Sequence, residues 1–324
     1  ARAYAARRIA VDTETNSLDA MQAELVGVSM AVAPGQACYI PLRHKSQDDL
    51  MGAGAPEQLN PALALGKLKP LLEDPRVLKI GHNMKYDAQI LGHEGIAIAP
   101  FDDTMLMSYI LDAGKDGGHG MDSLSVKLFE HNPIPFKEVC GTGKSQITFD
   151  YVPLDKATDY AAEDADITLR FWQVFKPRLG AEKAATVYET LERPLVSVLR
   201  QMEFEGIKVD RDLLRQFSNE FATRAGELEK ECYDLAGETF NLGSPKQLGT
   251  ILFEKLGLEG GKKTKTGAYA TGADILEGLA AQGHDLPRKI VDWRQLTKLK
   301  STYTDALHDC INPKTGRVHT SYSM

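Results

Sequence analysis

Three short stretches of this chain place carboxylates and a tyrosine at spacings that could hold metal ions. Asp12 and Glu14 end a predicted strand two residues apart, so their side chains point to one face. Asp87 lies in the first turn of a predicted helix after a buried strand, near the sheet edge where ligands gather. Tyr160 and Asp164, four residues apart, share a helical face. Adjacent carboxylates repel unless a cation neutralises them, and Mg²⁺ takes such oxygen ligands.

Each stretch also has a plain structural explanation. Asp12 and Glu14 could form a solvated strand end. Asn83 could cap the helix that follows it, with Asp87 as a surface acid, and Tyr160 could lie at a core boundary. Taken singly, the motifs favour these explanations. Acids on a helix that faces an acidic strand would nevertheless repel one another unless a positive charge lay between them.

The elements that would position these side chains form a mixed α/β layer in the first half of the chain. Apolar runs predict strands at 9–11, 25–32, 38–42 and 77–80. A turn at Pro34-Gly35 joins the second and third strands as a hairpin. Helical periodicity predicts helices at 61–73, 85–93, 104–111, 122–129 and 155–175. Strands followed by helices imply packed layers of both kinds.

The second half of the chain is almost wholly helical. Amphipathic segments predict helices at 181–205, 210–236, 246–256, 274–281 and 287–308. Pro194 should kink or break the first of them, because proline lacks the N–H of a regular helix. A basic, exposed loop is expected at 260–267, and a strand start at 317–322 has no expected partner strand.

Composition limits the class of protein. The chain has 324 residues, enough for two or three domains, and no apolar run approaches the ~18 residues of a membrane span. Its four cysteines form no C-x-x-C pair, which excludes a thiolate zinc site and fits a reducing cytosol. The net charge of −7 argues against a nucleic-acid partner. However, residues 1–180 hold 24 Asp+Glu against 18 Lys+Arg, and two divalent ions would offset most of that excess.

The four acids and the tyrosine follow the order of the DEDDy pattern of 3′–5′ exonucleases, which have an RNase H-like fold. The strings DTETNSLD, GHNMKYD, FDDTMLMSYIL, MDSL and YAAEDADIT resemble the proofreading domain of bacterial family A DNA polymerases. Farther along, FNLGSPKQL, ILFEKLGL, KLKSTYTDAL and INPKTGRVHTSY resemble the thumb of that family. The resemblance implies an α/β RNase H-like (DEDD exonuclease) domain over 1–180. A mostly α-helical, thumb-like domain over 181–324 would follow, without palm or fingers.

The resemblance also implies roles for single residues. Asp12 would bridge two divalent ions, Mg²⁺ or alternatively Mn²⁺ or Zn²⁺, and Glu14 and Asp164 would complete the first site. Asp87 would hold the second ion through water, and Tyr160 would orient the attacking water. The implied reaction is hydrolysis of the terminal phosphodiester at a single-stranded or frayed DNA 3′ end. This is the proofreading step of DNA replication and repair.

Contacts with DNA are implied in both halves. At the single-stranded 3′ end, the expected contacts are Leu18, Asn83, Lys85, Tyr86 and Phe136. Leu18 and Phe136 would wedge and stack on the terminal base, and stacking tolerates any base. In the thumb-like half, a loop would either grip duplex backbone or simply be solvated, and it contains Lys262, Lys263 and Lys265.

Two alternatives stay open. An RNase D-like exoribonuclease shares the DEDDy residues, although the thumb-like half argues against it. A catalytically inactive DNA-binding scaffold of a family A polymerase would have lost the carboxylates, and all of them are present. The expected protein is therefore an exonuclease portion of a DNA polymerase that acts as a monomer in the bacterial cytoplasm, at the nucleoid, with no membrane association. Polymerase activity is expected only of a complete parent enzyme.

Overall fold

A five-stranded mixed sheet forms the centre of the first half of the chain in the computed structural model. Its strands run in the order β3-β2-β1-β4-β5 and are β1 (Arg8–Thr15), β2 (Leu25–Ala33), β3 (Gln36–Pro41), β4 (Leu78–Gly81) and β5 (Phe101–Asp103). β1 pairs antiparallel with β2 and parallel with β4, so β1 and β4 end at the same edge of the sheet. The predicted α/β layer is confirmed. The sequence did not predict β5, which is three residues long.

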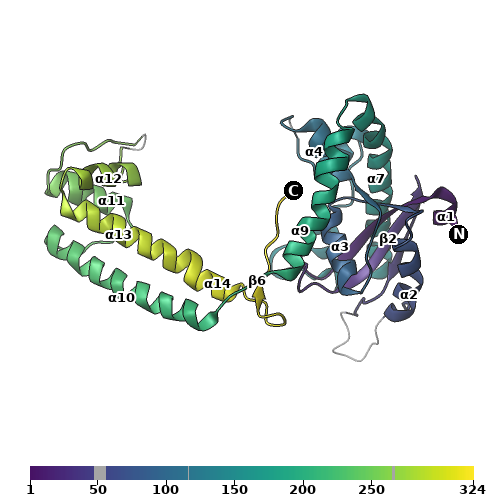
Figure 1. Ribbon diagram of the computed structural model, residues 1–324, viewed down its shortest axis with the longest axis horizontal. Coiled ribbons are helices and arrows are strands. Elements are labelled where there is room, and N and C mark those ends of the chain that lie inside the picture. The colour runs from purple at the N-terminus through teal and green to yellow at the C-terminus, as the bar shows by residue number, and fades with distance from the viewer. Residues whose placement is uncertain (47–55, 116, 265–266) are drawn as a thin grey trace. The chain divides into compact units, whose positions relative to one another are not determined.

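The described residues are 1–46, 56–115, 117–264 and 267–324, and they divide into two units. The first unit comprises Ala1–Glu205 and Thr320–Met324, and the second comprises Gly206–His319 (Figure 1). The expected boundary at residue 180 lies at the end of a long helix, whereas the first unit continues to Glu205. The chain therefore leaves the first unit after Glu205 and returns to it at Thr320.

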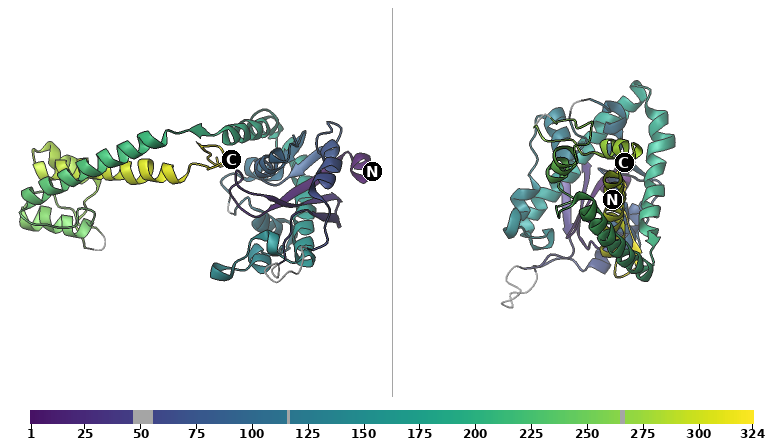
Figure 2. Two further views of the ribbon diagram at one scale, coloured as in Figure 1. Left: turned by 90° about the horizontal axis from the view of Figure 1, so that it is seen from below. Right: turned by 90° about the vertical axis from the view of Figure 1, so that its left-hand side faces the viewer.

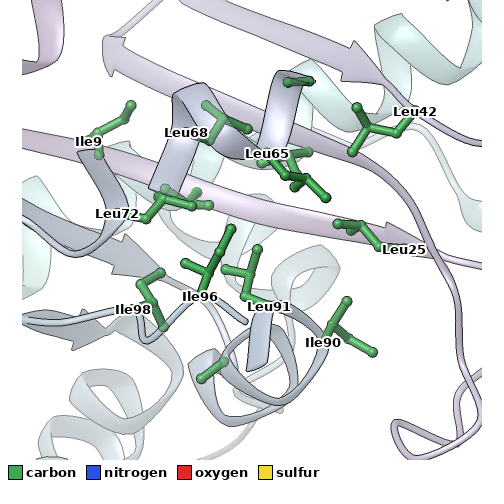
Figure 3. Packing of buried hydrophobic residues seen from close by; sticks show 14 of the residues in the cluster. Ile9, Leu25, Leu42, Leu65, Leu68, Leu72, Ile90, Leu91, Ile96 and Ile98 are labelled. Carbon is green, nitrogen blue, oxygen red and sulfur yellow. The ribbon is translucent and has the colours of Figure 1, made fainter. Parts of the chain in front are cut away.

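The helices of the first unit lie around its sheet, either on the strands or on other helices. They are α1 (Arg2–Ala6), α2 (Pro61–Leu72), α3 (Met84–His93), α4 (Thr104–Asp112), α5 (Met121–Phe129), α6 (Phe136–Cys140), α7 (Leu154–Ala181), α8 (Ala185–Val187) and α9 (Arg193–Glu205). α7 and α3 lie on the strands, whereas α9 lies on α3. Leu72 of α2 and Leu91 of α3 pack in one cluster with Ile9 and Leu25 (Figure 3). Within the described residues, no helix is long and apolar enough to cross a membrane.

The alternation of side chains along β1 decides which residues face which helix. Val11 packs in the cluster of α2 and α3, whereas Ala10 packs with Ala165 of α7. Because successive strand residues point to opposite faces, Asp12 and the acid two residues after it follow Ala10 toward α7. Thr13 follows Val11 toward α3. The strand therefore supplies both faces of the site described below.

Gly27 of β2 leaves room for a tyrosine beside the end of β1. It pairs with Glu14 across the sheet, and a Cβ at residue 27 would lie 2.1 Å from the hydroxyl oxygen of Tyr39. That hydroxyl is hydrogen-bonded to His44 Nε2 at 2.8 Å, so the ring cannot move without losing the bond. We expect Gly27→Ala to destabilise the fold by about 1–3 kcal/mol through overpacking.

Chemical denaturation would measure this change, with Gly66→Ala as the matched control. Gly66 is an exposed residue inside α2 with open space around it. Alanine there should stabilise the fold by about 0.5–1 kcal/mol, because it improves helix propensity. Equal effects of the two substitutions would contradict the steric explanation.

The second unit is built on two long helices that lie side by side, α10 (Arg211–Ala236) and α13 (Asp285–Leu299) (Figure 1 and Figure 2). The remaining elements are α11 (Pro245–Gly249), α12 (Ala273–Ala281), α14 (Ala306–Asp309), β6 (Ile207–Lys208) and β7 (Arg317–Val318). π-Helical turns continue α11 at Thr250–Lys255 and α13 at Lys300–Asp305. The predicted helical character of this half is confirmed.

The structure agrees with the break expected near Pro194 but not with an unpaired last strand. The break expected near Pro194 takes the form of a π-helical turn, Tyr188–Glu192, directly before α9. The expectation that the last strand has no partner is wrong. β7 pairs antiparallel with β6, and Ile207 lies opposite Val318 in this pairing. A two-residue strand carries no periodicity, so no sequence pattern pointed to it.

Candidate active site

Three of the predicted acids converge at the edge of the sheet. Asp12 and Glu14 extend from the end of β1, and Asp164 comes from α7, which crosses that face. Their carboxylate oxygens lie within 4.8 Å of one another. Glu14 is buried, and its Oε1 has no hydrogen-bond partner in the described part of the chain. The cluster is a set of closely spaced hard oxygen donors with spare acceptor capacity.

The fourth acid approaches β1 from the opposite face. Asp87 lies in the first turn of α3, and its Oδ1 accepts hydrogen bonds from the Thr13 backbone N at 3.1 Å and from Thr13 Oγ1 at 2.6 Å. Since β1 and β4 are parallel, the helix that follows β4 begins where β1 ends. Thr13 therefore joins Asp87 to the strand segment between the other two acids.

Burial raises the pKa of all four carboxyl groups, and repulsion by neighbouring carboxylates raises the pKa of three of them further. Burial raises the pKa of Asp12 to about 7. Burial also raises the pKa of Glu14 well above its usual range, with further increases from the charges of Asp12, Asp164 and Asp87. The pKa values of Asp87 and Asp164 are raised for the same two reasons, burial first and the Asp12 charge next. Four acids that are costly to ionise together fit a site for divalent cations.

Tyr160 lies beside the carboxylates and is held by aromatic neighbours. Its ring centroid is 5.7 Å from that of Phe149 and 6.3 Å from that of Phe136. Burial, followed by the charge of Asp164, raises the pKa of Tyr160 far above its usual value. The phenol therefore stays protonated at neutral pH. It suits the orientation of a water molecule better than the removal of a proton.

A cleft of about 560 Å³ surrounds these groups. Its lining includes all five predicted catalytic residues and four of the predicted DNA contacts, Leu18, Asn83, Tyr86 and Phe136. Leu18 is 96% exposed and Phe136 is 45% exposed, so both present apolar surface at the cleft. Tyr86 donates a hydrogen bond to the Ser17 carbonyl at 2.6 Å, and burial raises its pKa to about 12.

The predicted lysine contacts lie elsewhere. Lys85 does not line the cleft. It is 5% exposed, and its ammonium group contacts Glu203 and the Tyr322 carbonyl. This burial argues against the predicted DNA contact, because the charge is already paired. Lys262 and Lys263 are exposed in the second unit, whereas Lys265 lies outside the described residues.

Thr13 and His82 are among the cleft residues that were not assigned a role from the sequence. Thr13 anchors Asp87, and only its place between the two acids of β1 hinted at this. His82 lines the cleft, and its Nδ1 lies 2.9 Å from Thr104 Oγ1. Because the Thr104 hydroxyl donates to the Gly81 carbonyl, His82 Nδ1 must carry the hydrogen in this pair. Burial lowers the pKa of His82 to about 4, so the ring is neutral at physiological pH.

Comparisons with known proteins agree with this geometry. A family model described as a 3′-5′ exonuclease matches residues 1–180, and one described as DNA polymerase family A matches residues 211–324. A DNA polymerase I from Rhizobium leguminosarum is 58% identical over 335 residues, which cover 100% of this chain and 33% of that protein. A DNA polymerase I from Pseudomonas aeruginosa is 48% identical over 321 residues, covering 98% and 34%.

A solved structure gives the same result. The POL domain of Pol1 from M. smegmatis, in complex with DNA primer-template and dNTP, matches with a TM-score of 0.77 at 26% identity. The match covers 97% of this chain and 48% of that one. The chain spans about a third of the length of the curated relatives named above.

These matches confirm the predicted resemblance and the fold class, an RNase H-like exonuclease domain joined to a helical polymerase region. The exonuclease family is metal-dependent, and the acidic cluster is compatible with a metal site. The chain belongs to the 3′–5′ exonuclease family, whose model matches residues 1–180, and its residues 211–324 match the model of DNA polymerase family A.

Proposed function

We propose that this chain is a two-metal-ion 3′–5′ exonuclease that shortens single-stranded or frayed 3′ ends of DNA, as the proofreading part of a longer DNA polymerase I. The observation that carries the proposal is the convergence of Asp12, Glu14 and Asp164, with Asp87 and Tyr160 lining the same cleft. Hydrolysis adds water to the terminal phosphodiester and breaks its bond to the 3′ oxygen. It releases a nucleoside 5′-monophosphate and leaves a new 3′ hydroxyl.

The donor set suits divalent cations. Asp12, Glu14 and Asp164 would hold one ion, and Asp12 with Asp87 a second, with Mg²⁺ as the first choice and Mn²⁺ or Zn²⁺ as alternatives. Glu14 Oε1 is buried and has no hydrogen-bond partner among the described residues, which supports this assignment. Bound cations would make water more acidic and neutralise charge on the phosphate.

The remaining residues of the cleft bind and orient. Tyr160 would orient the attacking water through its protonated hydroxyl. Leu18 and Phe136 offer apolar surface on which a terminal base can wedge and stack, whatever its identity. Asn83 and Tyr86 would hold the strand behind the terminal nucleotide. Mispaired ends unstack at lower cost, so the site would favour them.

Duplex binding is proposed for the second unit. The exposed side chains of Lys262 and Lys263, together with Lys265, would contact backbone phosphates near the thumb-like helices. The acting species would be a monomer in the bacterial cytoplasm, at the nucleoid. Polymerisation would belong to a longer enzyme of which this chain is one part.

A single assay separates this function from its alternatives. The chain is incubated with a 5′-labelled single-stranded DNA, or with an RNA of the same sequence, in Mg²⁺ or Mn²⁺. Stepwise shortening of the DNA from its 3′ end is expected, with little shortening of the RNA. Preference for RNA would favour an exoribonuclease, and binding of DNA without cleavage would favour an inactive scaffold.

The hydroxyl of Tyr160 can be tested by itself. Tyr160→Phe keeps the ring packed between Phe149 and Phe136 and removes only the group that orients water. We expect the single-turnover cleavage rate to fall by about 10- to 100-fold, the cost of losing orientation at a reacting atom. Mn²⁺ affinity, measured by calorimetry, should not change. A variant with the wild-type rate would remove Tyr160 from the catalytic set.

A further inference from the structure

A buried ion pair links α3, the helix that carries Asp87, to α9. Lys85 is two residues before Asp87 in α3 and contacts Glu203 of α9. Each of the two residues is 5% exposed. Burial of two opposite charges stabilises little by itself, but removing one partner leaves the other charge uncompensated. The pair therefore links α3 to α9, and replacing one partner alone is costly.

The same two side chains also hold a segment from the other end of the chain. The Tyr322 backbone N donates to Glu203 Oε1 at 2.6 Å, and the Tyr322 carbonyl accepts from the ammonium group of Lys85. Both backbone polar groups of one residue are thus engaged, as they would be in a strand. The Tyr322 side chain is 37% exposed, so the contact with Lys85 and Glu203 is made by the backbone of Tyr322.

This contact lies where the chain passes between its two units. The chain leaves the first unit after Glu205, two residues beyond Glu203, and returns at Thr320, two residues before Tyr322. On its other side, α3 is fixed to β1 by the hydrogen bonds from Thr13 to Asp87. The first turn of α3, which contains both Lys85 and Asp87, therefore connects the returning segment to a carboxylate that is proposed to bind metal.

We propose that Lys85 is a positioning residue that fastens α9 and the returning segment Thr320–Met324 to the helix carrying Asp87, so that docking of this segment sets the exonuclease rate. The proposal rests on the proposed exonuclease function. It assigns the buried lysine a role other than DNA binding. It also connects Thr320–Met324, which lies within the match to the polymerase family model, to the helix that carries Asp87.

The test uses the 324-residue chain and begins with Lys85→Met. We expect kcat on single-stranded DNA to fall by about 10- to 100-fold, since a displacement of about 1 Å can cost that much. KM should change little. The slope of log Kd against log salt should also be unchanged, whereas loss of a phosphate contact would lower it by about 0.7. A slope lowered by that amount would overturn the proposal, and Lys156→Met, an exposed lysine of α7, should behave as wild type.

A paired substitution separates positioning from stability. Lys85→Met with Glu203→Met removes both buried charges, so the melting temperature lost in the single variant should be recovered. The rate should stay low, because the backbone of Tyr322 is still released. Recovery of the rate together with the melting temperature would overturn the positioning role.

The returning segment can be tested without changing either charge. Tyr322→Pro removes the N–H that bonds to Glu203, whereas Tyr322→Ala keeps it. We expect the proline variant to cleave about tenfold more slowly, within the range of a misplaced catalytic group, and the alanine variant to match wild type. Equal rates would overturn the proposal.

Amide hydrogen exchange gives a readout that does not depend on cleavage. The amides of α3 should exchange faster in Lys85→Met and Tyr322→Pro than in wild type or Tyr322→Ala. If the wild-type chain cleaved no substrate, the exonuclease function would fail while this exchange pattern could still be observed. Unchanged exchange in an active chain would overturn the positioning role alone.

Discussion

Asp12→Ala is expected to lower the rate of 3′-end cleavage by at least about 10³-fold in saturating Mg²⁺. Asp12 belongs to the cluster whose oxygens lie within 4.8 Å, and it is the acid proposed to contact both cations. Cation sites supply several kcal/mol of transition-state stabilisation, and each 1.36 kcal/mol corresponds to about a tenfold rate change. Single-turnover cleavage of a labelled DNA strand measures the loss.

The matched control is Asp159→Ala, an exposed acid on the same helix as Asp164. This variant should keep the wild-type rate, because its carboxylate is outside the cleft lining. Slow degradation at one equal rate by wild type and both variants would indicate a contaminating nuclease. That result would remove the evidence for the two-metal assignment.

The carboxylate site could be predicted because its local geometry follows from residue type and spacing. Strand alternation places Asp12 and Glu14 on one face, and one helical turn separates Tyr160 from Asp164. The convergence of these pieces with Asp87 is different in kind. It depends on the parallel pairing of β1 with β4 and on the passage of α7 across the sheet. Only the resemblance to a family anticipated that part.

The burial of Lys85 could not be predicted from the sequence. This lysine lies between residues that line the cleft, so a contact with DNA was a reasonable expectation. Its burial is decided by Glu203 and Tyr322, which are 118 and 237 residues away along the chain. No local pattern carries information about such partners. The pairing of Ile207 with Val318 was missed for the same physical reason.

The raised pKa of Asp12 makes the stability of the fold depend on pH, and the Asp12→Asn variant should remove this dependence. In the folded, metal-free chain the pKa of Asp12 is about 7, against 3.8 for an ordinary aspartate. The folded state therefore holds a proton that the unfolded state has lost between these two values. Stability from this group is lost as pH rises. Asparagine has no such proton, so the variant should gain stability relative to wild type across that window.

The expected difference is near zero at pH 4 and on the order of 4 kcal/mol at pH 8, at about 1.36 kcal/mol per pKa unit. Urea denaturation of both chains in EDTA would measure it. The titration of His82 is common to both chains and cancels in the comparison. Glu14, Asp87 and Asp164 lose the repulsion of the Asp12 charge in the variant, which acts in the same direction. Asp159→Asn should show no pH-dependent difference from wild type, because the side chain is exposed.

Divalent cations should narrow the difference in stability between the two chains at pH 8. A ligand that binds only the folded state stabilises it by about 2.7 kcal/mol at a concentration of 100 times its Kd. Wild type would gain this stability from Mg²⁺ or Mn²⁺, whereas Asp12→Asn would gain less, because it has lost a carboxylate of the cluster. At pH 5 the cation must compete with bound protons, so the gain should be smaller. Equal stabilisation of the two chains by metal at pH 8 would contradict a role for Asp12 as a ligand.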